Sequence, residues 1–161
     1  MVLLNSRRAE ESKRGLICSG LESLTVNVMA DQIQIAVAAV SDSSSEAVIR
    51  DHRVRFDRPV TKGGGDSGPM GGEVFLASIA GCFMSNLLAA MRTREIKATD
   101  IQTVVTGMVD GTPPRFVGID LKVRGEGVDR DAMEKLVEIA GRGCIMVNTL
   151  RDKMDLRIGL L

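Results

Sequence analysis

The amino-acid sequence predicts an α+β fold whose elements follow in the order strands, long helix, strands, helix, strand. The chain has 161 residues, of which 44% are apolar, enough to form one domain with its own core. Alternating apolar residues before and after a long uncharged segment predict two groups of strands, and the segment itself predicts a helix. Strands and helices segregated along a chain are typical of α+β proteins.

The start of the chain differs in character from the rest. Residues 1–23 mix charged and small side chains without a clean period, so we expect an appended or partly mobile segment followed by one domain over 24–161. Cys18 lies in this segment and receives little functional weight. Charges in residues 1–14 interrupt the apolar stretch that a signal peptide needs, and the cysteine count is odd. We therefore expect a cytoplasmic protein with free thiols.

The first group of strands is expected over residues 24–60. Alternation across 33–37 predicts a strand with one solvent-facing side. The serine-rich turn 41–45 follows, and an extended run over 47–56 resumes the pattern. The two runs predict a hairpin whose loop is the serine-rich turn.

A glycine-rich connector is expected over residues 62–72. Its glycines do not match the phosphate-binding pattern GxxxxGK[ST] or the spacing of a dinucleotide fingerprint, and Pro69 interrupts them. The segment predicts a flexible connector rather than a nucleotide site.

The central helix is expected over residues 73–94, where Ala, Leu and Met are dense and proline is absent. The stretch from Val74 to Met91 carries no charge and is barely long enough to span a membrane. Ser78, Gly81 and Ser85 make that span a weak one. The sequence therefore favours a helix buried in a globular protein and no membrane partner.

The remaining elements complete the predicted order. They are strands over 101–123, an amphipathic helix over 129–141, a second cysteine segment over 142–151 that contains a short helix, and a last strand over 154–160.

Composition excludes several classes of function. Lys plus Arg and Asp plus Glu both total 21, so the electrostatic argument for a nucleic-acid partner is missing. Trp and Tyr are absent, which removes base-stacking platforms. With His52 as the single histidine, no metal site or Cys-His-acid constellation can be assigned, and no cofactor is predicted.

Two cysteines carry the chemistry that the sequence offers. Cys82 lies midway along the uncharged helix, where a cysteine can simply be packed in the core. Cys144 follows Gly143 at a helical turn whose backbone N–H groups would favour the thiolate. That glycine can equally serve only to end one helix and begin another. The pair is more informative than either cysteine alone.

Glu73 begins the central helix, where a carboxylate is favoured by the helix dipole. Helix geometry places it about two and a half turns and ~13 Å from Cys82, on the opposite face. Glu73 therefore cannot readily serve the Cys82 of its own chain. Any catalytic role would act across a symmetric dimer, in which each helix start reaches the partner's site.

Four arginines lie close together on the run that precedes the glycine-rich connector: Arg50, Arg53, Arg55 and Arg58. Most of them are expected to form a solvated strand face. One guanidinium near Cys82 would lower the pKa of its thiol and hold a peroxide oxygen.

Three segments carry a family resemblance: Gly-Gly-Asp-Ser-Gly-Pro at 64–69, Glu-Val-Phe-Leu-Ala-Ser-Ile-Ala-Gly-Cys at 73–82, and Arg-Gly-Cys-Ile-Met-Val-Asn-Thr-Leu at 142–150. Together with the element order over 24–161, the sequence resembles the OsmC/Ohr superfamily. The resemblance implies an intertwined homodimer in which two antiparallel sheets wrap central cysteine-bearing helices, with active sites at the subunit interface.

The same resemblance implies a thiol peroxidase that reduces organic hydroperoxides in an antioxidant stress response. Cys82 matches the peroxidatic cysteine, which becomes a sulfenic acid, and Cys144 matches the resolving cysteine that forms the disulfide with it. An external thiol, in relatives often a protein-bound dihydrolipoyl group, would reduce that disulfide. Glu73 matches the acidic residue before the first cysteine motif, and Arg55 is similar to the arginine of OsmC-type members.

Departures from the family pattern leave other interpretations open. The serine-rich turn lacks the arginine of Ohr-type members, Gly71-Gly72 stands where a proline often precedes the acid, and Ile145 replaces a common proline. A redox-sensing protein, or one that binds a small apolar ligand in the dimer cleft, is a second hypothesis. In a third, both cysteines are inert and function lies in protein partnership.

Overall fold

The computed structural model describes residues 32–161, and the chain forms two compact units divided between Gly68 and Pro69. We call the described residues 32–68 the N-terminal unit and residues 69–161 the C-terminal unit, and we describe each by itself. The expected extension over 1–23, with Cys18, lies outside the described residues.

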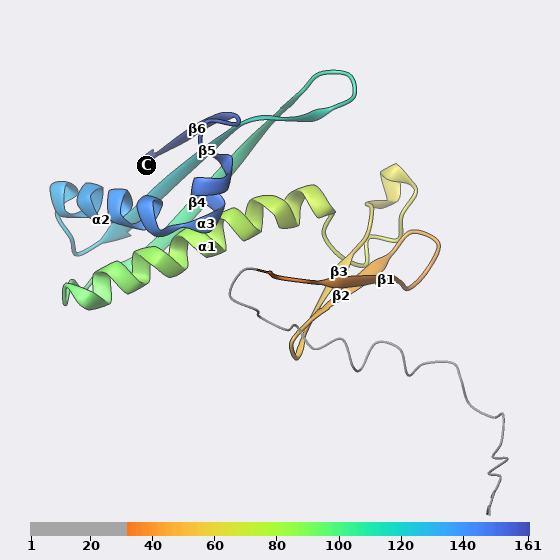
Figure 1. The fold of residues 1–161 in the computed structure, drawn as a ribbon, viewed down its shortest axis with the longest axis horizontal. Coiled ribbons are helices and arrows are strands. Elements are labelled where there is room, and N and C mark those ends of the chain that lie inside the picture. The colour runs from red at the N-terminus through yellow and green to blue at the C-terminus, as the bar shows by residue number, and fades with distance from the viewer. Residues whose placement is uncertain (1–31) are drawn as a thin grey trace, which may run out of the picture. The chain divides into compact units, whose positions relative to one another are not determined.

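The N-terminal unit contains an antiparallel sheet with the strand order β1-β2-β3 (Figure 1). The strands are β1 Ala36–Ala39, β2 Ser45–Ile49 and β3 His52–Phe56. β1 and β2 pair across the serine-rich turn, which confirms the predicted hairpin. The Ser41 and Ser44 hydroxyls lie 2.7 Å apart and the Ser44 N–H donates to Ser41 Oγ at 3.1 Å, so the turn is closed by its own side chains.

The single run expected over 47–56 was wrong, because it folds back on itself. Ile49 pairs with His52, which leaves Arg50 and Asp51 as a two-residue hairpin loop. Arg50 adopts a φ of 56°, in the left-handed region that such loops require. Glycine or asparagine usually marks this turn, and neither is present here. The extended pattern over 47–56 therefore contained no residue that marked the turn.

The glycine-rich connector wraps around the carboxylate of Asp57 over its first half. Asp57 is 5% exposed, and its Oδ2 accepts from the Ser67 hydroxyl at 2.7 Å, the Ser67 N–H at 3.0 Å and the Gly65 N–H at 3.2 Å. A Cβ on Gly64 would stand 2.0 Å from the Arg58 carbonyl oxygen. Glycine is therefore needed here for close packing, after a 3₁₀ turn at Val60–Lys62.

The C-terminal unit packs helices on one face of a three-stranded sheet (Figure 1). Its elements are α1 Gly71–Thr93, β4 Thr99–Asp110, β5 Arg115–Glu126, α2 Arg130–Gly143, α3 Ile145–Leu150 and β6 Asp155–Leu160. β4 and β5 form the second predicted hairpin. β6 pairs parallel to β5, so this sheet is mixed and not purely antiparallel as expected. The reason is the crossover through α2 and α3, which returns the chain to the end where β5 began.

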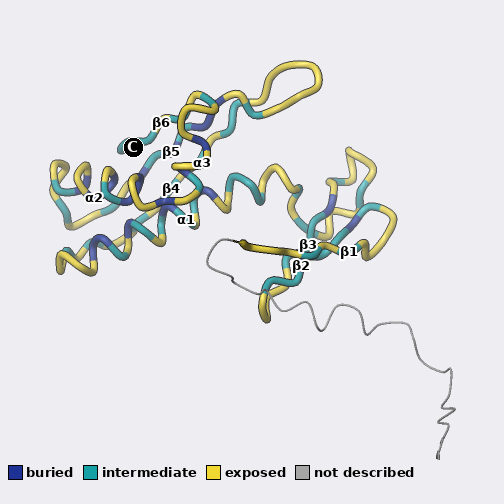
Figure 2. The backbone as a smooth tube through the Cα atoms, viewed as in Figure 1, coloured by how far each residue is buried: buried dark blue, intermediate teal, exposed yellow. Residues whose placement is uncertain are grey.

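The core of the C-terminal unit lies between α1, β5 and α2 (dark blue in Figure 2). Three side chains of α1 at helical spacing are fully buried: Ile79, Phe83 and Leu87. β5 contributes the alternating set Ile119, Leu121 and Val123, and α2 contributes Met133, Leu136 and Ala140. Each large apolar side chain here contributes about 1.5–3 kcal/mol by leaving water.

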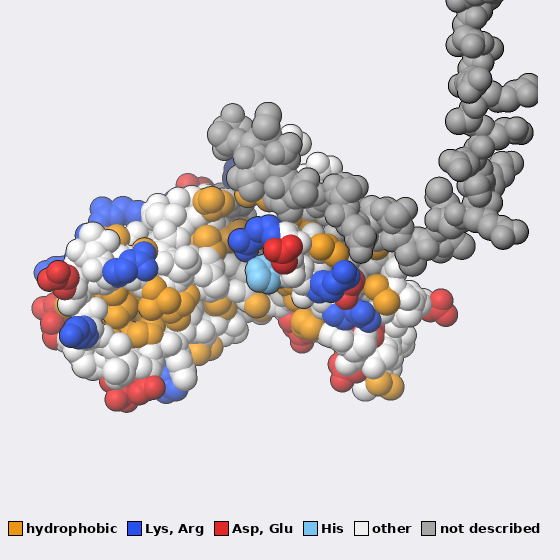
Figure 3. Space-filling model, turned by 90° about the horizontal axis from the view of Figure 1, so that it is seen from below, with side chains coloured by type: hydrophobic (Ala, Val, Ile, Leu, Met, Phe, Trp, Pro, Cys, Tyr) orange, Lys and Arg blue, Asp and Glu red, His pale blue; other side chains and the backbone are white. Residues whose placement is uncertain are grey.

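The opposite face of α1 is exposed, which differs from the helix expected to be buried on nearly every side. Ala77, Gly81, Ser85 and Leu88 lie on this face at successive helical turns. α1 is long and apolar enough to cross a membrane by length and composition, a test that core helices of globular proteins also pass, and 28% of its most apolar window is buried. Viewed from below, apolar side chains gather on the surface of the unit (Figure 3).

Candidate active site

The first cysteine of the site, Cys82, lies on α1 beside the core. It precedes the fully buried Phe83 and is itself half-buried, between the exposed Gly81 and the core face. Its carbonyl oxygen accepts a hydrogen bond from the side-chain amide of Asn86, one turn further along, at 2.9 Å. Cys82 therefore combines a fixed backbone with partial access to solvent.

The second cysteine, Cys144, is the single residue between α2 and α3. It has extended backbone angles, with φ −86° and ψ 116°, and is the N-cap of α3. Its side chain is completely buried. The carbonyl oxygen of Cys144 accepts from the Asn148 N–H at 2.9 Å, which begins α3 directly after the bend.

The structure brings the two cysteines into direct contact, although they are far apart in the sequence. The Sγ atoms lie 3.2 Å apart, with the Cys144 thiol donating to Cys82 Sγ, and both thiols are free. Packing of α1 against α3 holds them together. A sulfur pair at this separation can form a disulfide after a small movement, because the S–S bond itself is about 2.05 Å.

Burial raises the pKa of the Cys144 thiol, and the neighbouring Cys82 raises it further through its hydrogen bond and its charge. The backbone N–H groups of Val147 and Met146 act in the opposite direction. The sequence correctly indicated that N–H groups would point at this sulfur. These groups do favour the thiolate, but the loss of hydration outweighs them, so the expected net preference for the thiolate was wrong.

Glu73 lies in the first turn of α1, where its carboxylate caps its own helix. The Met70 N–H donates to Glu73 Oε2 at 2.7 Å, and the side chain is exposed. This is the structural role that the sequence allowed for it. A role in the chemistry of Cys82 stays a prediction.

Arg55 lies on β3 in the N-terminal unit, whereas both cysteines lie in the C-terminal unit. Its Nη2 contacts Glu46 Oε2 at 3.2 Å, and Arg53 Nη1 contacts Glu46 Oε1 at 2.7 Å. Hydrogen bonds from Arg53 and then Arg55 hold the pKa of Glu46 below its usual range. Arg55 Nε is buried and has no hydrogen-bond partner among residues 32–161. The part that Arg55 plays at the cysteines stays a prediction.

Two residues that contact predicted site residues, one in each unit, were not identified from the sequence. Asn86 contacts the Cys82 turn, and Glu46 binds the predicted arginine. The spacing of Asn86, four residues after Cys82 on an otherwise uncharged helix, was a usable signal because such pairs share a helix face. The pairing of Glu46 with Arg55 depends on the hairpin at Arg50 and Asp51, which the sequence did not reveal.

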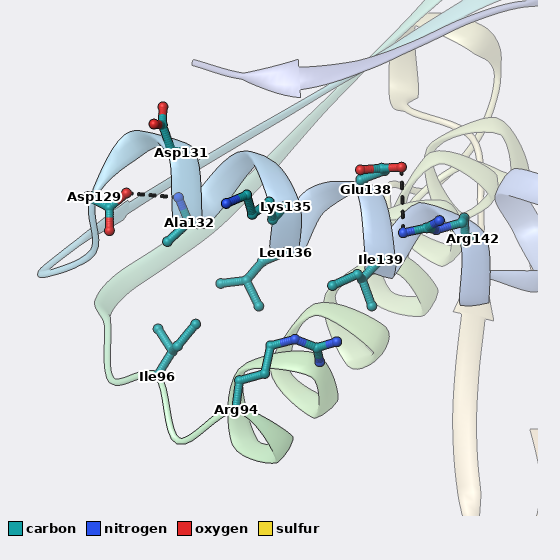
Figure 4. Close-up of a pocket in the computed structure, with 10 residues that line it drawn as sticks. All are labelled: Arg94, Ile96, Asp129, Asp131, Ala132, Lys135, Leu136, Glu138, Ile139 and Arg142. Carbon is teal, nitrogen blue, oxygen red and sulfur yellow. Dashed lines mark hydrogen bonds and ion pairs between the residues drawn. The ribbon is translucent and has the colours of Figure 1, made fainter.

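A separate cavity of about 500 Å³ lies between α2 and the end of α1 (Figure 4). Its apolar side chains are Ile96, Leu136 and Ile139, and charged side chains surround them. Some of the charged groups have structural partners: Asp129 Oδ1 accepts the Ala132 N–H at 2.9 Å and caps α2, and Glu138 Oε1 lies 3.5 Å from Arg142 Nη2. Neither cysteine lines this cavity. Over residues 32–161, no group of three or more His, Cys, Asp and Glu side chains could hold a metal ion.

The fold is similar to several solved structures. The OsmC-like protein of Mycoplasma pneumoniae is 18% identical, with a TM-score of 0.71 over 83% of this chain and 98% of that chain. The organic hydroperoxide resistance protein of Legionella pneumophila is 20% identical, with a TM-score of 0.64 over 79% of this chain and 96% of that chain. That of Bacillus subtilis is 22% identical, with a TM-score of 0.61 over 80% of this chain and 98% of that chain.

An α+β fold with a long core-packed helix that carries one member of a close thiol pair defines a class of dithiol proteins. A family model described as OsmC-like protein matches residues 63–159, which is more than half of the chain and includes both cysteines. The chain therefore belongs to the OsmC-like protein family, as the sequence resemblance predicted. No curated protein matches the chain.

Proposed function

We propose that the protein is a thiol peroxidase that reduces organic hydroperoxides. The Cys82 thiolate attacks a peroxide oxygen, the O–O bond breaks, and the alcohol leaves after taking a proton, so that Cys82 becomes a sulfenic acid. Cys144 then attacks that sulfur, an S–S bond forms and water leaves. An external dithiol, such as a dihydrolipoyl group, supplies two electrons and two protons to restore both thiols. The contact of the two sulfurs at 3.2 Å is the observation that carries this proposal.

The unequal surroundings of the two cysteines support their separate roles. Cys82 is half-buried, so a peroxide can approach it, whereas Cys144 is fully buried. Burial keeps the pKa of Cys144 high, so this residue remains a thiol until Cys82 has been oxidised. The Cys144 thiol donates its hydrogen bond to Cys82 Sγ, so the resolving sulfur already lies against the nucleophile. These features fit Cys82 as nucleophile and Cys144 as resolver.

We propose further that the active protein is an intertwined homodimer. Small side chains on the exposed face of α1 would let a second helix approach closely, and Leu88 on that face is 47% exposed. In the N-terminal unit, Ile33, Ile35 and Val37 are 71%, 48% and 57% exposed, which is apolar surface that another subunit would bury. Glu73 would then act on the partner's Cys82. An active monomer in solution would contradict this assembly.

The partners of the proposed enzyme follow from its chemistry. The substrate is an organic hydroperoxide, the reductant is an external thiol, and free thiols fit the reducing cytoplasm. The balance of positive and negative charge offers no attraction to nucleic acid.

A redox-sensing or apolar ligand-binding protein is the second candidate function. The observation in its favour is that both predicted activating groups already have partners close in the sequence. Glu73 caps its own helix and Arg55 is paired with Glu46. Without an activating arginine, Cys82 would oxidise slowly and the protein would report peroxide rather than remove it.

The deciding experiment is anaerobic titration of the reduced protein with cumene hydroperoxide and, separately, with hydrogen peroxide. Wild type should lose two thiols and gain a Cys82–Cys144 disulfide, fastest with the organic peroxide. Cys144→Ser should stop at a sulfenic acid on Cys82, and Cys82→Ser should not react. A wild type that forms no peroxide-dependent disulfide would overturn the peroxidase proposal.

Arg55 and Arg53 provide a matched pair for the choice between enzyme and sensor, since both bind Glu46 from the same strand. In the peroxidase, Arg55→Ala should slow peroxide reduction about 100-fold, the scale expected for a group that orients and stabilises the reacting oxygen, while Arg53→Ala changes it little. Equal and small effects of both substitutions would favour the sensor.

A further inference from the structure

The side chain of Asn86 connects the two cysteine segments. Its amide nitrogen donates to the Cys82 carbonyl oxygen at 2.9 Å, so one end of the amide is fixed to the Cys82 turn. A carbonyl oxygen accepts hydrogen bonds only, which requires the nitrogen on that side and turns Oδ1 the other way. Asn86 is half-buried on α1.

The other end of the amide lies against Gly143, the last residue of α2 and the neighbour of Cys144. A Cβ placed on Gly143 would stand 2.8 Å from Asn86 Oδ1 and 3.6 Å from Asn86 Cγ. The first distance is shorter than real Cβ contacts, so a side chain on residue 143 would push the Asn86 amide aside. One amide thus spans from the backbone of Cys82 to the backbone beside Cys144.

We propose that Asn86 is a positioning residue, which together with Gly143 sets the distance between Cys82 Sγ and Cys144 Sγ. This inference rests on the proposed function only for its biological use, the fast resolution of the Cys82 sulfenic acid. Asn86 does not touch the reacting sulfurs in this role. It fixes the Cys82 turn and limits how far the α2–α3 junction can move toward or away from it.

The physical reason is that disulfide formation depends steeply on geometry. Cys144 is fully buried and cannot search for Cys82 by side-chain rotation through solvent. Its approach is set by the backbone at the α2–α3 junction, and a misplacement of about 1 Å can cost on the order of 100-fold in rate. Without the Asn86 amide, the α2–α3 junction could lie at a wider range of distances from the Cys82 turn.

The test uses the full chain with a Cys18→Ser background, so that only the two thiols of the site are counted. The fraction of disulfide is measured at equilibrium in glutathione buffers, which requires no peroxide. Asn86→Ala should lower the equilibrium constant for the Cys82–Cys144 disulfide by about tenfold or more. Alkylation of Cys82 by iodoacetamide, measured with Cys144→Ser added, should stay within about twofold, because the amide positions Cys82 without activating it.

Thr93→Ala is the matched control. The Thr93 hydroxyl donates to the Ala89 carbonyl oxygen at 3.0 Å, which is the same contact to the preceding turn of the same helix, far along it from Cys82. A general loosening of α1 would change both variants alike. We expect Thr93→Ala to keep the wild-type disulfide equilibrium.

Moving side-chain volume from residue 86 to residue 143 distinguishes a positioning role of Asn86 from a general loss of stability. Gly143→Ala alone should weaken the disulfide, because its new methyl group meets Asn86 Oδ1 and pushes the amide off the Cys82 carbonyl oxygen. Combined with Asn86→Ala, the same methyl group enters the space that Oδ1 and Cγ leave. The double variant should recover most of the wild-type equilibrium constant.

Three results would overturn the positioning role: an Asn86→Ala equilibrium within about twofold of wild type, additive losses in the double variant, or a wild type that forms no disulfide in glutathione. Failure of the peroxidase proposal gives a different result. In that case the disulfide forms in glutathione and depends on Asn86, while cumene hydroperoxide leaves the thiols unchanged.

Discussion

In the C-terminal unit the fully buried side chains are apolar and come from α1, β5, α2 and α3, whereas the buried side chains of residues 32–68 are Ala47, Ser44 and Asp57. The C-terminal unit is therefore held by apolar packing, and the N-terminal unit is held by hydrogen bonds and ion pairs. A three-stranded sheet needs an apolar face packed on something to be stable in water. The N-terminal unit is therefore organised locally by polar contacts, and the proposed intertwined homodimer would supply the apolar packing that its sheet lacks.

The chemistry follows the same division. The sulfur pair lies in the unit with the rigid apolar core, where Phe83 beside Cys82 and Val147 close to Cys144 are both fully buried. The predicted arginine lies in the unit built from polar contacts. Rigid surroundings suit a pair of sulfurs that must meet at one distance. A polar, exchangeable network suits a guanidinium that, in the proposed enzyme, would also bind a peroxide.

The largest effect should come from emptying the core of the C-terminal unit. Phe83→Ala removes a fully buried side chain and should lower the free energy of unfolding by about 3–5 kcal/mol. Leu88→Ala, on the same helix but 47% exposed, is the control and should cost less than about 1 kcal/mol in the isolated subunit. Urea unfolding followed by circular dichroism measures both, because the chain has no Trp or Tyr. Equal losses of stability in the two variants would contradict the conclusion that apolar packing holds the C-terminal unit.

A smaller, local effect should come from Asp57 in the N-terminal unit. Its hydrogen bonds from Ser67 hold the pKa of this carboxyl well below its usual range, so it stabilises the loop at neutral pH. This stabilisation is complete above the ordinary carboxyl pKa and is lost as the pH falls toward the lowered folded value. Asp57→Asn should release the loop at every pH, because an amide presents N–H groups to donors.

Nuclear magnetic resonance of the Gly65 and Ser67 amide protons tests this. In wild type their chemical shifts should stay constant down to pH 4 and move only below it, because the carboxyl pKa lies under its ordinary value of about 4. In Asp57→Asn they should take loop-like values at pH 7, while amides of the C-terminal unit stay unchanged. A midpoint at the ordinary carboxyl pKa would show that the loop is not held by this group.

The third predicted effect is a loss of folding stability at alkaline pH, and it is due to Cys144. Burial raises the pKa of its thiol, so folding favours the protonated form. The stability that this gives is complete below the unfolded thiol pKa of about 8.5 and is lost as the pH rises toward the folded value. Urea unfolding of the reduced protein should show wild type losing stability between pH 8 and pH 10 relative to Cys144→Ala. A constant difference between the two across that range would contradict the raised pKa.

The sequence was sufficient for the elements that carry a clear period. Alternation on β5 indicates its buried face because it depends on local geometry alone, whereas the uncharged central helix did not reveal which of its faces is buried. The turn at Arg50 and Asp51 was missed since neither residue signals a left-handed turn, and the parallel pairing of β6 was missed since it depends on a long-range crossover. Glycines that seemed to give freedom to the connector in fact allow close packing around Asp57.

The candidate site divides in the same way. Cys82 and Cys144 could be chosen from their motifs, but their contact joins two segments far apart in the chain and only the folded structure shows it. The raised pKa of Cys144 could not be predicted, because it depends on burial that exceeds the effect of two N–H groups. The spacing of Asn86 from Cys82 was visible in the sequence, but its proximity to Gly143 on another helix was not.

The smallest effect should come from surface charge on the C-terminal unit. Arg130 and Glu134 form an ion pair at 3.0 Å on α2, and their side chains are 72% and 54% exposed. Glu134→Gln should therefore change the free energy of unfolding by less than about 0.5 kcal/mol, and 1 M NaCl should abolish the change.

Glu46→Gln in the N-terminal unit is the counterpart, since Glu46 is 16% exposed and accepts from two arginines. Its substitution should disturb the β2 and β3 amide signals at both salt concentrations, because desolvated pairs are screened less. A larger effect of Glu134→Gln than of Glu46→Gln would contradict the conclusion that ion pairs stabilise the N-terminal unit more than the C-terminal unit.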